Sequence, residues 1–141
     1  MKTFNILFVC KYNRFRSKLA EAYFKKINKN KKIKVSSGGL FWGTPTDKNA
    51  IRLAKEFKIK LSGKPKGIRY KSLKKQDLIV IVANNVPKKI FKYRNRYPRK
   101  VIVWRIPDEL KTNEEIIKRE IKPLLKKLEK LNKQLEKGKW M

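Results

Sequence analysis

Residues 4–24 read FNILFVCKYNRFRSKLAEAYF, and this stretch organises the rest of the chain. The apolar run from Phe4 to Val9 is rich in aromatic and branched residues, which predicts a buried strand. Leu19, Tyr23 and Ile27 recur at helical spacing, which predicts an amphipathic helix. A strand that delivers a loop to a helix N-terminus forms an anion site, because free backbone N–H groups and the positive end of the helix dipole meet there.

The loop itself begins with Cys10, the only cysteine, and ends with Arg16 and Ser17. The loop amides, the helix dipole, Arg16 and the Ser17 hydroxyl would all stabilise a thiolate. A guanidinium matches phosphate, and an anion beside it would relieve the repulsion that a cation meets in a first helical turn. Asn13 tolerates the left-handed conformation that a cradle of N–H groups requires. A lone cysteine is often an inert buried residue, but this combination predicts a cysteine nucleophile in a phosphate-binding loop.

Composition narrows the class of protein. A chain of 141 residues is expected to form a single domain over 1–141. No apolar run is long enough for a signal peptide or a membrane span, and one cysteine allows no internal disulfide, so a cytoplasmic protein without membrane attachment is expected. The chain has no histidine, which removes Cys–His and Ser–His catalysis and argues against a zinc site. Acid–base chemistry must therefore fall to other side chains.

The net charge of +29 is the most unusual feature of the composition. It would attract acidic partners, and it predicts weak, nonspecific binding of nucleic acid. The lysines are scattered along the whole chain, however, which favours the simpler interpretation that most of them cover solvated faces.

Strands and helices are expected to alternate along the chain. Further strands are predicted at 33–36, 77–83 and 101–104, and helices near 46–57, 88–94 and after 112, with Pro123 bending or dividing the last one. This pattern predicts an α/β fold with a mainly parallel sheet. Ligands bind outside the carboxyl ends of such strands, so the residues that follow the strands should share one rim: Cys10, Ser36, Asn84 and Asp108.

Asp108 is the candidate general acid, because it lies in the loop after the last predicted strand. It could protonate a leaving oxygen and later activate water, a role worth about a hundred- to ten-thousand-fold in rate. The alternative is a carboxylate that only caps the following helix.

These residues resemble the low-molecular-weight protein tyrosine phosphatase family, whose signature is C-x5-R-S with an internal Asn. The resemblance covers nearly the whole chain, including Ser36-Ser37-Gly38 after the second strand and the late Asp108. It implies a three-layer α/β/α domain with a four-stranded parallel sheet in the order 2-1-3-4. It also implies a phosphomonoester hydrolase of the protein-tyrosine-phosphatase type, with no cofactor and no metal, acting on a phosphorylated protein or a small aryl phosphate as a monomer or weak dimer.

The resemblance also implies roles for individual residues. Cys10 would form a phosphocysteine, Arg16 would hold the phosphoryl oxygens, and Asp108 would be the general acid. Ser17 would support the thiolate, and Asn13 with Ser36 would fix the loop. Tyr12 and Trp42 would wall the substrate pocket. The phosphate-binding set comprises Lys11, Tyr12, Asn13, Arg14, Phe15, Arg16 and Ser17.

Several loop positions depart from the family pattern. Phe15 stands where the family usually has a second cysteine, so disulfide protection of the nucleophile is absent. Tyr12 replaces a usual Gly, Lys18 a usual Pro, and Arg14 an Ile, or a Thr in the phosphoarginine-specific members. These changes are compatible with the mechanism but bear on the choice of substrate: a pocket rimmed by Lys11, Tyr12 and Arg14 could prefer a more acidic or smaller substrate than phosphotyrosine.

Two rival functions remain open at this point. The related arsenate reductases relay electrons through additional cysteines, which this chain lacks. A basic, non-catalytic protein could instead use the loop to dock nucleic acid or phosphoprotein.

Overall fold

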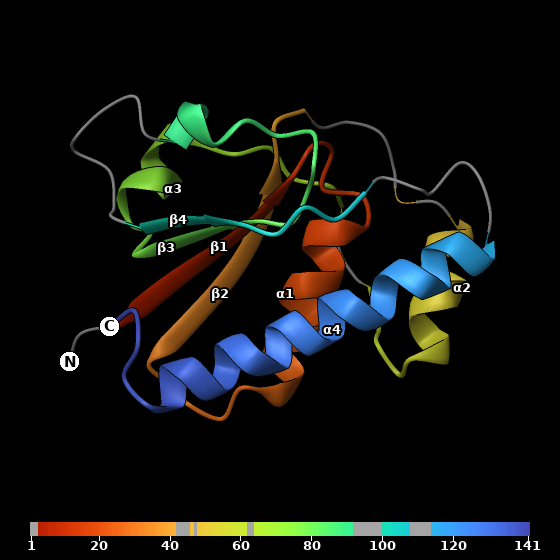
Figure 1. The fold of residues 1–141 in the computed structure, drawn as a ribbon. Helices are drawn as coiled ribbons and strands as arrows, with labels where there is room; N and C mark the ends of the chain where they lie inside the picture. The colour runs from red at the N-terminus through yellow and green to blue at the C-terminus, as the bar shows by residue number, and fades with distance from the viewer. Residues whose placement is uncertain (1–2, 42–45, 47, 62–63, 92–99, 108–113) are drawn as a thin grey trace.

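The computed structural model describes residues 3–41, 46, 48–61, 64–91, 100–107 and 114–141. Its sheet has four parallel strands in the order β2-β1-β3-β4 (Figure 1). The strands are β1 (Phe4–Cys10), β2 (Ile33–Gly39), β3 (Leu78–Ile81) and β4 (Lys100–Val103). The α/β class, the parallel sheet and the strand order expected from the sequence are confirmed.

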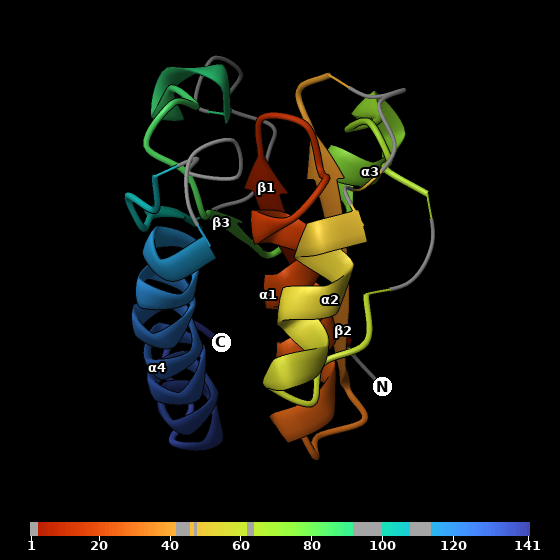
Figure 2. The ribbon, with the colours of Figure 1, turned by 90° about the vertical axis from the view of Figure 1, so that its right-hand side faces the viewer.

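The helices lie on both sides of this sheet (Figures 1 and 2). They are α1 (Arg16–Ile27), α2 (Lys48–Glu56), α3 (Tyr70–Lys74), the 3-10 helix η1 (Lys88–Phe91) and α4 (Glu114–Glu136). Helices α1 and α4 pack together on one face, and α3 lies on the other. An ion pair of 3.0 Å between Lys118 and Glu56 joins α4 to α2.

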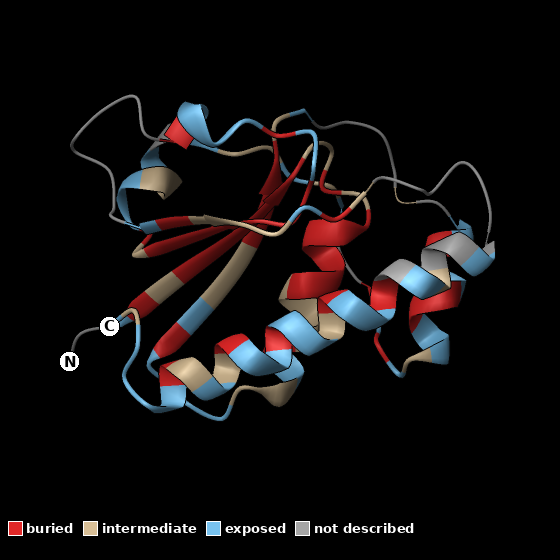
Figure 3. Cartoon of the chain, viewed as in Figure 1, coloured by how far each residue is buried: buried red, intermediate tan, exposed pale blue. Residues whose placement is uncertain are grey.

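Of the two outcomes predicted for Pro123, a bend or a division of the last helix, the structure excludes the division. Pro123 lies inside α4, which runs unbroken from Glu114 to Glu136. The proline therefore does not divide the helix, although it removes one backbone hydrogen bond. An apolar stripe along α4 is buried and holds the helix to the rest of the domain (Figure 3). Its buried members are Ile121, Leu124, Leu128, Leu131 and Leu135.

The middle of the sheet forms the core. Every residue of β3 is buried, as expected for a strand covered on both faces. The ring centroids of Phe8 in β1 and Phe24 in α1 lie 6.0 Å apart, and this contact fixes the helix against the strand. Cys10 pairs in register with Gly39, so the loop after β1 begins beside the end of β2. Within the described residues, no helix has both the length and the apolar character needed to cross a bilayer.

Candidate active site

Cys10 is the last residue of β1, and its side chain is buried with 2% exposure. Its sulfur lies 2.9 Å from the Ser17 hydroxyl oxygen. The backbone N–H of Asn13 donates to the same sulfur at 3.2 Å. The loop thus curls around the sulfur before α1 begins at Arg16.

Asn13 holds this loop in shape. Its φ of 55° is left-handed, as the sequence predicted for a cradle of N–H groups. The side-chain amide donates to the hydroxyl oxygens of Ser17 at 2.7 Å and Ser37 at 3.0 Å. Its carbonyl oxygen accepts the backbone N–H of Lys66 at 2.8 Å. One fully buried side chain therefore ties the loop to α1, to β2 and to the segment before α3.

These bonds also fix where the protons lie. The backbone N–H of Lys66 can only donate, so the Asn13 carbonyl oxygen must face it and the NH₂ group must face the two serines. The Ser17 oxygen accepts from Asn13, and its own proton can be donated to Cys10 when the sulfur is a thiolate, which has no proton to give. The Ser37 proton goes to the Glu21 carboxylate. The network therefore delivers two hydrogen-bond donors to the sulfur, the Ser17 hydroxyl and the Asn13 N–H, which suits a thiolate.

The predicted brace on β2 was Ser36, and the structure corrects it by one residue. The Asn13 side chain donates to the hydroxyl oxygen of Ser37, the neighbour of Ser36 on β2. Successive side chains of a strand point to opposite faces, so only one of two adjacent serines can reach the loop.

Two contacts of the loop were missed from the sequence. A Cβ on Gly39 would lie 2.6 Å from the backbone of both Tyr12 and Asn13, so only glycine fits where β2 passes the loop. The backbone of Lys66 bonds to Gly39 as well as to Asn13. The Gly-Gly pair that ends the second strand was the available signal for this close approach, because glycine in a strand often marks one.

Arg16 is 4% exposed in the first turn of α1. Its guanidinium donates to the Ile106 carbonyl oxygen at 2.9 Å and to the Asn85 side-chain oxygen at 3.3 Å. These acceptors follow β4 and β3, so the strand ends do converge as predicted. After β3, the Asn85 side chain accepts from Arg16, and the backbone N–H of the predicted Asn84 donates to the same Ile106 carbonyl oxygen at 3.2 Å.

The charges around the loop are unbalanced. Arg16 and Lys18 are both buried in the first turn of α1, and that turn contains no acidic residue. Burial lowers the pKa of Lys18, partly offset by Glu21, which raises it. Two buried cations at the positive end of a helix dipole favour an anion in their neighbourhood.

Backbone donors are available for that anion. Among the described residues, the N–H groups of Lys11, Tyr12 and Phe15 have no hydrogen-bond acceptor. Phe15 is 6% exposed and packs into the core, so at this position a large ring replaces the thiol that the family usually has.

The mouth of the loop is aromatic and basic. The rings of Tyr12 and Phe41 lie 5.9 Å apart, and the Lys11 ammonium is 5.3 Å from the Tyr12 ring centroid. Phe41 is 55% exposed, and its N–H bonds to the Lys11 carbonyl oxygen at 2.9 Å. The sequence predicted Trp42 as the wall of this pocket; Trp42 and Asp108 both lie outside the described residues. Phe41 was missed as a site residue.

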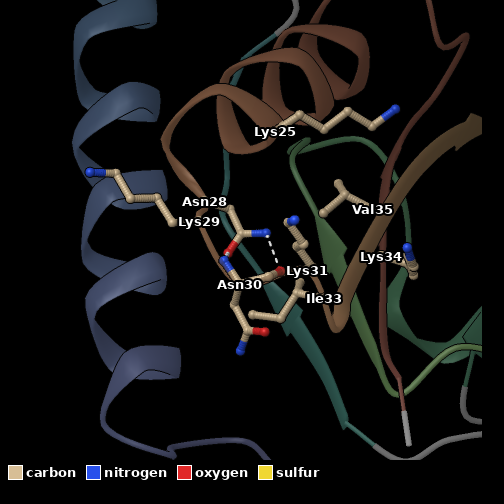
Figure 4. Close-up of a pocket in the computed structure, with 8 residues that line it drawn as sticks. All are labelled: Lys25, Asn28, Lys29, Asn30, Lys31, Ile33, Lys34 and Val35. Atoms are coloured by element: carbon tan, nitrogen blue, oxygen red, sulfur yellow. Dashed lines mark hydrogen bonds between the residues drawn. The ribbon is translucent and has the colours of Figure 1, made fainter. Parts of the chain in front are cut away.

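A second group of cations lies at the other end of α1 and has a different character (Figure 4). We call this surface the lysine hollow; its volume is about 620 Å³. Its lining comprises Lys25, Asn28, Lys29, Asn30, Lys31, Ile33, Lys34 and Val35. In Figure 4 the side chains of Lys25 and Lys29 point away from each other, and no ammonium groups gather at one point. Within the described part of the chain, no cluster of His, Cys, Asp and Glu could hold a metal ion.

A cysteine at a strand end, a loop with free N–H groups and a buried arginine at the following helix define the class of cysteine-based phosphatases. The family described as low molecular weight phosphotyrosine protein phosphatase matches residues 5–139. The chain belongs to this family.

Solved structures agree with this assignment. A mutant of YwlE from Bacillus subtilis is 25% identical, with a TM-score of 0.83, over 95% of this chain and 99% of that one. A low molecular weight protein tyrosine phosphatase from T. tengcongensis is 25% identical, with a TM-score of 0.81, over 94% of this chain and 99% of the other. An arsenate reductase from Archaeoglobus fulgidus is 26% identical, with a TM-score of 0.71, over 90% of this chain and 98% of that one. Comparison with the curated proteins gives no match.

Proposed function

We propose that the protein hydrolyses phosphomonoesters through a phosphocysteine intermediate on Cys10. The observation that carries this proposal is the hydrogen-bond network in which the Ser17 hydroxyl and the Asn13 N–H both contact the Cys10 sulfur and can both donate to a thiolate. A thiolate held in this way is a nucleophile, and the anion-binding loop around it would place a phosphoryl group next to it.

The proposed reaction has two steps. In the first, the Cys10 thiolate attacks phosphorus, the bond from phosphorus to the ester oxygen breaks, and the leaving oxygen takes a proton from Asp108. Arg16 and the loop N–H groups hold the equatorial oxygens, whose charge increases in the transition state. In the second, Asp108 accepts a proton from water as the water attacks phosphorus, which releases phosphate and restores the thiolate.

The mouth of the loop supports an aryl phosphate as substrate. Tyr12 and Phe41 offer aromatic faces beside the loop, against which a phosphotyrosine ring could pack. A similar structure is described as the arginine phosphatase YwlE with a phosphorylated active-site serine. In this chain the Lys11 ammonium, which lies beside the Tyr12 ring, would repel the guanidinium of phosphoarginine. We therefore favour phosphotyrosine, in a protein or as a small aryl phosphate, over phosphoarginine.

Arsenate reduction is less well supported, although a similar structure is an arsenate reductase. Reduction through an internal relay needs additional thiols, and Cys10 is the only cysteine in the chain. Phe15 stands at the loop position where the resemblance implies a second cysteine.

The test is hydrolysis of p-nitrophenyl phosphate at mildly acidic pH by wild type and by Cys10→Ser, with Lys31→Gln from the lysine hollow as the matched surface control. We expect wild type and Lys31→Gln to be equally active and Cys10→Ser to lose activity by at least about a thousandfold. Equal activity of wild type and Cys10→Ser, or no activity in either, would contradict the proposal. Parallel assays with phosphotyrosine and phosphoarginine peptides then decide the substrate class.

A further inference from the structure

A groove between the edge strand β4 and the C-terminal half of α4 combines aromatic rings with lysines. Its volume is about 220 Å³. The strand side consists of Ile102, Val103 and Trp104, and the helix side of Lys127, Lys130, Leu131, Gln134 and the following Trp140. None of the described residues that line it is acidic.

The two tryptophans are held in defined positions. Trp104 lies against the core, with its ring centroid 6.4 Å from that of Phe8. Trp140 adopts a left-handed backbone conformation with a φ of 76°, which is uncommon for a large side chain. Its indole N–H donates to the Gln134 side-chain oxygen at 3.2 Å. The chain end thus folds back so that a second ring, half-exposed, borders the groove.

Lysines surround both rings. The ammonium groups of Lys100 and Lys139 lie 5.4 and 5.1 Å from the Trp140 ring centroid, and that of Lys127 lies 6.0 Å from the Trp104 ring centroid. Lys130 completes the basic lining on α4. These lysine side chains are exposed, so their charges can reach a bound anion as well as the rings.

This arrangement fits a single-stranded nucleic acid. Proteins that bind single strands pair a basic groove, which follows the phosphates, with aromatic rings on which bases stack. A partner that offers only negative charge would contact the lysines but would gain nothing from the exposed part of the Trp140 ring. A duplex hides its base faces, whereas a single strand exposes them to Trp140.

We propose that this groove, between Trp104, Trp140 and the lysines of α4, binds single-stranded nucleic acid by base stacking on Trp140 and phosphate contacts from Lys127 and Lys130. The site is independent of the proposed hydrolysis, because Trp140 takes no part in the Cys10 loop. It gives the high positive charge a specific place to act.

The test uses fluorescence anisotropy of a labelled oligouridylate over a series of salt concentrations. Trp140→Ala should weaken binding by about tenfold, in the range expected for one stacked base, whereas Trp140→Phe should stay within about threefold of wild type. The pair Lys127→Gln and Lys130→Gln should weaken binding and reduce the salt slope by about 0.7 for each phosphate that is no longer neutralised. The pair Lys29→Gln and Lys31→Gln removes the same charge from the lysine hollow and should change affinity by about twofold at most.

Heparin is the control for charge alone, since it carries anions without bases. Its binding should be the same for wild type and Trp140→Ala, as should the hydrolysis of p-nitrophenyl phosphate. The proposal is overturned if wild type does not bind the oligonucleotide, if Trp140→Ala binds it as tightly as wild type, or if both lysine pairs lose affinity equally. An equal loss of heparin and oligonucleotide binding in Trp140→Ala would also overturn it.

Discussion

The two ends of α1 both carry cations, but only the N-terminal end is built as an anion site. At that end Arg16 is buried, fixed by two hydrogen bonds, and placed where the helix dipole is positive. At the C-terminal end, in the lysine hollow, Lys25 and Lys29 are exposed and lie where the dipole is negative, so they neutralise it without any ligand.

The asparagines of the two regions differ in the same way. Asn13 is fully buried and ties the loop to three other segments. The Asn28 side chain bonds to the backbone N–H and carbonyl oxygen of Asn30, within one exposed turn. Charge and residue type are alike at the two ends, whereas the buried arginine and the buried, fixed asparagine belong to the loop. The comparison teaches that the net charge of +29 does not distinguish the two ends of α1, whereas burial and fixed side-chain geometry do.

The largest difference between the two ends of α1 should be the effect on kcat/KM of substituting their cations. Arg16→Lys keeps the charge but loses the planar fork, so kcat/KM for p-nitrophenyl phosphate should fall by about a hundred- to a thousandfold. Lys29→Gln and Lys31→Gln should leave it unchanged, measured in the same steady-state assay. A loss of less than about tenfold in Arg16→Lys, or a similar loss in the hollow variants, would remove the distinction between the two ends.

The second contrast concerns the asparagines. Asn13→Ala removes three side-chain hydrogen bonds in a buried network and should lower the free energy of unfolding by about 3 kcal/mol. Asn30→Ala changes an exposed turn and should cost about 1 kcal/mol or less. Urea unfolding at neutral pH measures both, and the hydrolysis assay should show reduced kcat only for Asn13→Ala. Equal destabilisation of the two variants would mean that Asn13 is an ordinary loop residue.

A third contrast lies within β2. Gly39→Ala would push a methyl group into the loop backbone, which cannot move without opening the site, and should cost about 2 kcal/mol and much of the activity. In Gly38→Ala the new Cβ meets the Ile68 side chain at 3.1 Å, and that side chain can adjust. Thermal unfolding and kcat/KM of the two variants compare them directly; a milder effect of Gly39→Ala than of Gly38→Ala would contradict the close approach.

The smallest effect should come from Lys18. Burial lowers its pKa below 10.5, so folding disfavours the charged ammonium. Below the lowered pKa of the folded protein, Lys18 is charged in both the folded and the unfolded protein, and the full cost of burying the charge applies. This cost disappears as the pH rises from the lowered pKa to the ordinary value of 10.5. Lys18→Met should therefore raise the melting temperature at neutral pH by about 2–4 °C, for a gain of about 1 kcal/mol.

Two features make this test specific. The difference between wild type and Lys18→Met should shrink as the pH approaches 10.5. Lys31→Met, in the exposed hollow, should show neither the gain nor the pH dependence. A Lys18→Met variant that melts below wild type at neutral pH would show that its ion pairing outweighs burial.

The sequence predicts the fold and the loop more completely than it predicts the contacts around them. The run from Phe4 to Val9 and the helical spacing after Arg16 are local patterns, so the strand, the loop and the helix follow from them. Asn13 was also predictable, because its left-handed conformation is a local preference.

Contacts that depend on register were not predictable in this way. Whether Ser36 or Ser37 faces the loop depends on how β2 pairs with β1, and a shift by one residue exchanges the two faces. The choice of Asn85 over Asn84 depends likewise on how the turn after β3 is placed. Phe41 was overlooked because an exposed aromatic acquires its role only once its ring is seen beside Tyr12.

The central claim is that Cys10 carries the phosphoryl group during turnover. The most direct measurement is rapid acid quenching of the enzyme with excess p-nitrophenyl phosphate, followed by mass spectrometry of the peptide that contains Cys10. We predict that this peptide gains the mass of one phosphoryl group in wild type and that the Lys31→Gln control gains it equally. An enzyme that hydrolyses the ester during the same interval while the Cys10 peptide stays unmodified would contradict the account.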